Sequence, residues 1–92
     1  MKVLIENEVW RNLQRINSYC ILKYGNSFGN KLINDIIRVI QLLENNPYLY
    51  AVQNSKGDRF IPLINGYKLI YQVNDNMVCI HSLRGKGSKD TY

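Results

Sequence analysis

The chain has 92 residues, of which 46% are hydrophobic and 21% are charged. This composition excludes wholesale disorder, which requires low hydrophobicity and a high net charge, and the length predicts one small domain over residues 1–92. No apolar run approaches the roughly 18 residues that a membrane-spanning helix needs. The charged first residues are unlike a secretion signal, so we expect a cytoplasmic protein that does not contact a membrane.

The charge balance indicates an anionic partner. Twelve Lys and Arg residues against seven Asp and Glu residues leave a net charge of +5, which favours nucleic acid or an acidic protein segment. Two cysteines, Cys20 and Cys79, lie far apart, and we expect reduced thiols in a reducing compartment. With a single histidine and no Cys/His cluster at ligand spacing, we predict neither a metal nor a cofactor.

The first half of the chain predicts one strand and two helices. Residues 1–5 form a short β-rich run. Apolar side chains then recur at spacings of three and four, which predicts amphipathic helices over 8–23 and 27–44. Gly25 is a helix-ending glycine and Pro47 stops the second helix, so the two helices should form an antiparallel hairpin. The polar face of the first helix is expected to hold Arg11, Asn12, Gln14, Arg15 and Asn17.

The second half predicts three strands joined by tight turns. We expect strands over 59–64, 67–73 and 77–83, with a two-residue hairpin turn at Asn65-Gly66 and a second turn over 74–76. One face of the middle strand is apolar and is expected to face the core; its side chains are Tyr67, Leu69, Tyr71 and Val73.

The order of these elements predicts an α+β fold. An N-terminal strand precedes an antiparallel helix hairpin, which packs on a small antiparallel sheet completed by three C-terminal strands. The helices should cover one face of the sheet and leave the other face partly open.

An ordered set of short segments resembles the RelE/ParE superfamily of bacterial toxins from type II toxin–antitoxin modules. Both helix endings match those that are usual in the superfamily. The predicted strand over 67–73 and the acidic turn after it resemble the superfamily's most recognisable stretch. A short basic segment that contains glycine closes the last strand. The segments are Lys23-Tyr24-Gly25, residues 42–47, residues 66–75 and Leu83-Arg84-Gly85-Lys86.

The resemblance implies a RelE/ParE-like fold and one of two toxic activities. One branch of the superfamily cleaves messenger RNA in the ribosome, and the other inhibits DNA gyrase. Members are neutralised by a cognate antitoxin, which we expect to be acidic and to form a hetero-oligomer with the toxin. We favour ribosome-dependent RNA cleavage. A ParE-like gyrase inhibitor, or a degenerate member that only binds its antitoxin, remains an alternative.

The resemblance also indicates which residues would act on RNA. Family RNases use Lys and Arg side chains on the open sheet face, often with a late Tyr. Lys68 stands where Arg is usual in the family. We expect Arg59 and Arg84 to lie on the same sheet face, where they would also stabilise the transition-state charge on the phosphate. The expected catalytic residues are Arg59, Lys68, Arg84 and Tyr92, and the expected nucleic-acid-binding residues are Lys86 and Lys89.

The lone histidine is a weaker candidate. His81 is the side chain whose ordinary titration range suits proton transfer at neutral pH. It alternates with Met77, Cys79 and Leu83, however, so we expect a half-buried strand residue. No carboxylate is an obvious catalytic base, and Asp58 is interpreted as a turn residue.

Overall fold

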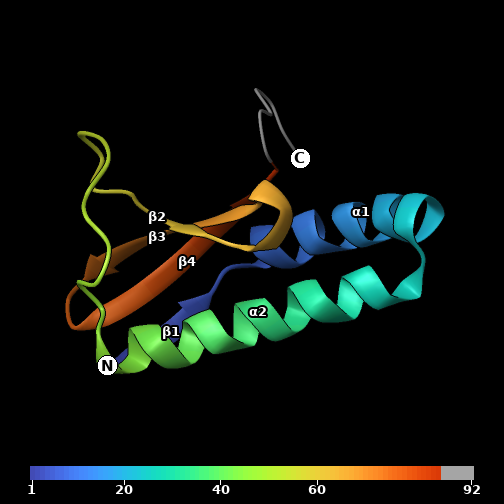
Figure 1. Cartoon of the computed structure of the whole chain (residues 1–92). Coiled ribbons are helices and arrows are strands. Elements are labelled where there is room, and N and C mark those ends of the chain that lie inside the picture. Colours follow the sequence, from blue (N-terminus) through green and yellow to red (C-terminus); the bar gives the residue numbers. More distant parts are fainter. Residues whose placement is uncertain (86–92) are drawn as a thin grey trace.

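The computed structural model describes residues 1–85, apart from the side chains of residues 20, 21, 24, 26 and 28. Within this part of the chain, two long helices lie beneath a four-stranded sheet (Figure 1). In chain order the elements are β1 (Lys2–Ile5), α1 (Asn7–Tyr24), α2 (Asn26–Asn45), β2 (Arg59–Pro62), the 3₁₀ turn η1 (Ile64–Gly66), β3 (Lys68–Asn74) and β4 (Met77–Arg84). The predicted α+β fold is confirmed, and the helix bounds differ from the expected ones by one residue at each end.

The sheet is mixed, where the sequence predicted an antiparallel one. Its strand order is β1-β4-β3-β2. The three C-terminal strands are antiparallel neighbours, but β1 pairs with β4 in parallel, with Lys2 opposite Met77 and Ile5 opposite Ile80. The helix hairpin explains this arrangement, because it returns the chain to the start of β1, where the terminal amine of Met1 donates to the Glu44 carbonyl at 2.9 Å.

The two helices cover one face of the sheet and enclose the core (Figure 1). The predicted core face of β3 is confirmed, since Leu69 and Tyr71 are fully buried and Tyr67 is nearly so. Among the described residues, no helix is both long enough and apolar enough to cross a membrane. The core is completed from both helices and the other strands, chiefly by Val9, Ile16, Leu32, Ile36, Val39, Leu43, Ile61, Val78, Ile80 and Leu83.

Two tight turns set the register of the hairpins. At Asn65-Gly66 both residues have positive φ, 56° and 80°, and the Tyr67 amide donates to the Ile64 carbonyl, as a two-residue turn of this sequence requires. Asp75 and Asn76 likewise have positive φ between β3 and β4. Both predicted turns are therefore confirmed.

A β-bulge interrupts β4. Ile70 pairs with Ser82 while the next residue, Tyr71, pairs with Ile80, so His81 is the extra residue. Asn12 of α1 stabilises the strand beyond the bulge, because its side-chain oxygen accepts from the Leu83 amide at 3.1 Å. Asn12 is 1% exposed. Its expected place on the polar face of α1 is therefore wrong, since this amide supplies a hydrogen bond inside the fold.

Candidate functional site

The sheet face that the two helices do not cover carries two cations directly opposite each other. Lys68 at the start of β3 pairs with Arg84 at the end of β4, and side chains of paired residues share a face. Like charges in this position repel. Neither side chain forms an ion pair with a described carboxylate, and the Lys68 ammonium instead lies 4.6 Å from the centre of the Phe60 ring. This unbalanced pair is the clearest candidate for binding an anion.

Arg59 does not share this face. It pairs with Tyr71, a core residue, so its side chain starts on the helix side of the sheet. Its guanidinium donates to the Tyr50 carbonyl and lies 5.2 Å from the Tyr48 ring centre. The expected gathering of three cations on the open face is therefore found for Lys68 and Arg84 only. Arg59 holds the loop that follows α2.

The three other candidates, Tyr92, Lys86 and Lys89, lie outside the described residues. Their expected roles stay predictions. The described site is thus built from β2, β3, β4 and the loop before β2.

A buried carboxylate organises that loop. Asp58 is 8% exposed. Its two oxygens accept from Asn54 at 3.0 Å, from Gln72 at 2.8 Å, and from the ring of His81 at 2.8 Å. Burial alone raises the pKa of Asp58, but the three hydrogen bonds and the charge of His81 outweigh it and lower the pKa from 3.8 to about 2. Asp58 is therefore an ionised acceptor at neutral pH, and interpreting it as a simple turn residue missed its role.

His81 is half-buried, as expected, but its contact with Asp58 was not expected. The bulge puts Leu83 into the core, while His81 faces Asp58 on the open side. The adjacent Ser82 is 6% exposed, and its hydroxyl has no hydrogen-bond partner among the described residues. Ser82 pairs with Ile70, so it lies on the open face between His81 and Arg84. No sequence signal marks the bulge or this pairing of Asp58 with His81.

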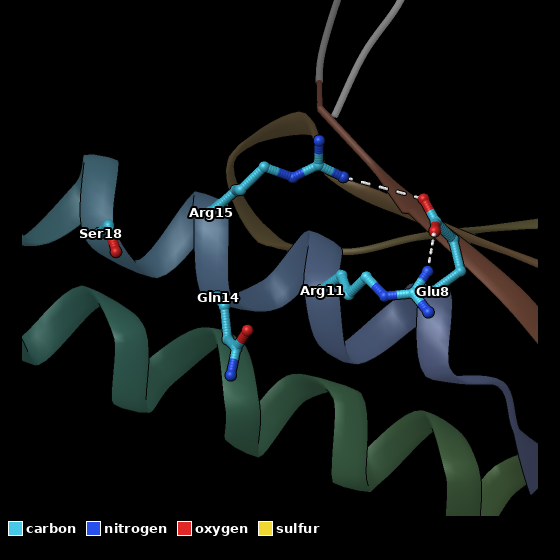
Figure 2. Close-up of a pocket in the computed structure, with 5 residues that line it drawn as sticks. All are labelled: Glu8, Arg11, Gln14, Arg15 and Ser18. Carbon is cyan, nitrogen blue, oxygen red and sulfur yellow. Dashed lines mark hydrogen bonds and ion pairs between the residues drawn. The ribbon is translucent and has the colours of Figure 1, made fainter.

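Three arginines of the two helices are paired with carboxylates. Figure 2 shows a shallow depression along α1, where Arg11 and Arg15 both reach Glu8, at 3.2 and 3.8 Å. Arg38 of α2 forms an ion pair with Asp35 at 2.7 Å. Lys68 and Arg84 lack such a partner among the described residues. Within residues 1–85, no group of three His, Cys, Asp or Glu side chains is arranged to hold a metal ion.

Comparison with solved structures places this arrangement in a known fold. The chain is similar to one from the chromosomal ParDE toxin–antitoxin system of P. aeruginosa, with a TM-score of 0.79 and 16% identity over 94% of this chain and 96% of that one. It is also similar to the isolated E. coli RelE toxin, with a TM-score of 0.59 and 19% identity over 97% of this chain and 86% of that one. No protein-family model and no curated protein matches the sequence. The chain therefore has the fold shared by ParE and RelE toxins.

Proposed function

We propose that this protein is the toxin of a type II toxin–antitoxin pair and that it cleaves messenger RNA on the ribosome. The proposal rests mainly on the Lys68–Arg84 pair, two cations that share one sheet face and have no carboxylate partner within residues 1–85. The fold likeness to RelE supports it. A phosphodiester seated there would relieve the repulsion between the two cations, which gives the pair a use that a purely structural role lacks.

The chemistry required is stabilisation of charge on phosphorus. When the 2′-hydroxyl of RNA attacks its own phosphate, negative charge grows on the phosphate oxygens, and fixed cations lower the barrier to that state. Arg84 can donate two parallel hydrogen bonds, whereas Lys68 acts as a point charge whose position is set by the Phe60 ring. The ribosome would hold the message in place.

Gyrase inhibition is the second candidate. The chain superposes better on the ParDE chain, at a TM-score of 0.79, than on RelE, at 0.59. The helix hairpin is long, with 18 residues in α1 and 20 in α2. In this account the helices, and not the open face, would carry the activity.

An acidic antitoxin is the proposed partner, and the cytoplasm, where ribosomes and gyrase are found, is the proposed site of action. The net charge of +5 would attract its acidic segment. Exposed apolar side chains after α2 would add contact area; these are Tyr48, Leu49 and Val52.

Induced expression of the protein alone tests the proposal. We expect growth arrest with new message ends and normal DNA supercoiling. Replacing Lys68 and Arg84 by alanine together should abolish both the arrest and the new ends, because the phosphate would lose its two cations. Message ends are mapped by primer extension, and supercoiling is read on plasmid topoisomers.

A matched double variant controls for charge. Lys31→Ala with Arg38→Ala removes one lysine and one arginine from the exposed surface of α2, and it should remain toxic. Intact messages with blocked supercoiling would favour gyrase inhibition. Normal growth in the wild type would favour a degenerate member that only binds its antitoxin.

A further inference from the structure

We propose that two copies of this protein form a symmetric dimer through the outer side of the helix hairpin. Three large apolar side chains are exposed there. Trp10 of α1 is 46% exposed, and Ile33 and Ile37 of α2 are 38% and 48% exposed. Exposed apolar side chains that gather on one surface mark a protein-binding site. We call this surface, with the amides Gln14 and Asn34 at its border, the hairpin face.

The contact between the two helices places the three apolar side chains together. Gly29 of α2 packs against Asn17 of α1, since a Cβ atom on Gly29 would lie 2.1 Å from the Asn17 Oδ1 atom. The helices run antiparallel (Figure 1). Two turns along α2 from this contact therefore pass Ile33 and reach Ile37, while two turns along α1 reach Trp10. The apolar side chains thus form one strip along the seam between the helices.

The hairpin face carries no charged side chain within residues 10–17 and 30–41. In Figure 2 Arg11 and Arg15 point toward Glu8, whereas Gln14 points to the other side, toward α2. On α2 the carboxylate of Asp35 accepts from the amide at the start of η1 at 2.9 Å, away from α1. Helical spacing puts the charged residues of these segments on the flanks of the hairpin; they are Arg11, Arg15, Lys31, Asp35 and Arg38.

A second copy of the chain is the partner that this surface fits. Two chains that each carry a net charge of +5 repel each other, so they associate best through a face without charge. An acidic partner would gain little there, because the cations lie elsewhere. Gln14, Asn34 and Gln41 are exposed beside the apolar strip. Each amide both donates and accepts, so this surface can form hydrogen bonds with an identical one across a two-fold axis.

The size of the hairpin face suits a small dimer. The 20 residues of α2 extend about 30 Å, and two helices side by side are about 20 Å wide. A face of these dimensions is comparable to the roughly 800 Å² that each partner buries in a stable interface. Two hairpins would form a four-helix layer between two sheets. The sheet faces that carry Lys68 and Arg84 would stay uncovered in such a dimer.

Ile37→Glu tests the interface in the purified full-length protein under reducing conditions. In sedimentation equilibrium the wild type should pass from monomer to dimer across the micromolar range, and its melting temperature should rise with concentration. Ile37→Glu should weaken association by at least about 30-fold, because two charges would be buried, and its melting temperature should not depend on concentration. Leu49→Glu is the matched control. Leu49 is 52% exposed and lies in the loop after α2, so this variant should still dimerise.

Asn34→Lys is a second variant, which tests the interface even if Ile37→Glu fails to fold. Asn34 is exposed, and lysine favours a helix more than asparagine does, so the monomer should fold while association weakens. A wild type that stays monomeric across the range would overturn the inference and leave the hairpin face to another partner, such as the antitoxin. A dimer that persists in both variants would also overturn it. Neither result bears on RNA cleavage, which is proposed for the opposite side of the sheet.

Discussion

Asp58 joins the loop before β2 to two strands of the sheet. Its carboxylate accepts from side chains of the loop, of β3 and of β4. In turn its own amide donates to the side-chain oxygen of Asn54 at 3.2 Å. A carboxylate with this many donors is stabilised in its charged form. The attachment of the loop to the sheet should therefore depend on pH.

The pKa of Asp58 predicts a loss of stability in acid. The pKa of Asp58 is about 2 in the folded protein and 3.8 ordinarily. Its contribution to the free energy of unfolding is therefore complete above about pH 4 and is lost as the pH falls toward about 2. It amounts to about 2 kcal/mol. Asp58→Asn should therefore lower the free energy of unfolding by about that amount at pH 7 and by little at pH 2. Urea unfolding of both proteins at the two pH values measures this, and an equal difference at both would contradict it.

The candidate residues could be chosen from the sequence, but the sheet faces on which they lie were only partly predictable. Alternation placed Lys68 opposite the apolar face of β3 correctly. In β2, Phe60 and Ile61 are adjacent apolar residues, so alternation could not decide which faced the core, and Arg59 was assigned to the wrong side. The environment of His81 depends on a bulge and on a contact across 23 residues, neither of which leaves a local pattern.

At the scale of elements, the two helices approach closely at a glycine. Gly29 of α2 is buried, and a Cβ atom built on it would lie 2.1 Å from the Oδ1 atom of Asn17 in α1. A side chain at position 29 can therefore enter only if Asn17 moves.

This contact predicts coupling between the two positions. Gly29→Ala should stabilise the wild type by less than the roughly 1 kcal/mol that alanine gains in helix propensity, because the end of the Asn17 side chain must turn away to admit the new Cβ atom. In the Asn17→Ala background the same change should stabilise the protein by about 1 kcal/mol. A double-mutant cycle of urea unfolding measures the difference. Equal effects of Gly29→Ala in both backgrounds would contradict the account.

Elements with strong local signals were predicted well. The helices follow from apolar periodicity, and both hairpin turns follow from Asn, Asp and Gly residues that tolerate positive φ. The pairing of β1 was not predictable in the same way, because it joins residues about 75 positions apart and depends on how the helix hairpin returns the chain. Long-range pairing is a property of the assembled fold.

For the whole molecule, the two layers separate the buried core from the proposed site. The helices and the inner face of the sheet hold the core, while the outer face holds Lys68, Arg84, His81 and Ser82. Substitutions of Lys68 and Arg84 should therefore change the proposed activity more than stability. The two proposed activities predict different surfaces, the open face for RNA cleavage and the helix hairpin for gyrase inhibition.

Cleavage of a ribosome-bound message by the purified protein is the most direct test of the central claim. We expect the wild type to leave new ends bearing a 2′,3′-cyclic phosphate. The Lys68→Ala/Arg84→Ala protein should cut at least about 10²-fold more slowly while remaining folded, and the Lys31→Ala/Arg38→Ala protein should cut at the wild-type rate. Equal cleavage by wild type and the open-face variant would contradict the site, and an intact message with blocked gyrase supercoiling would contradict the activity.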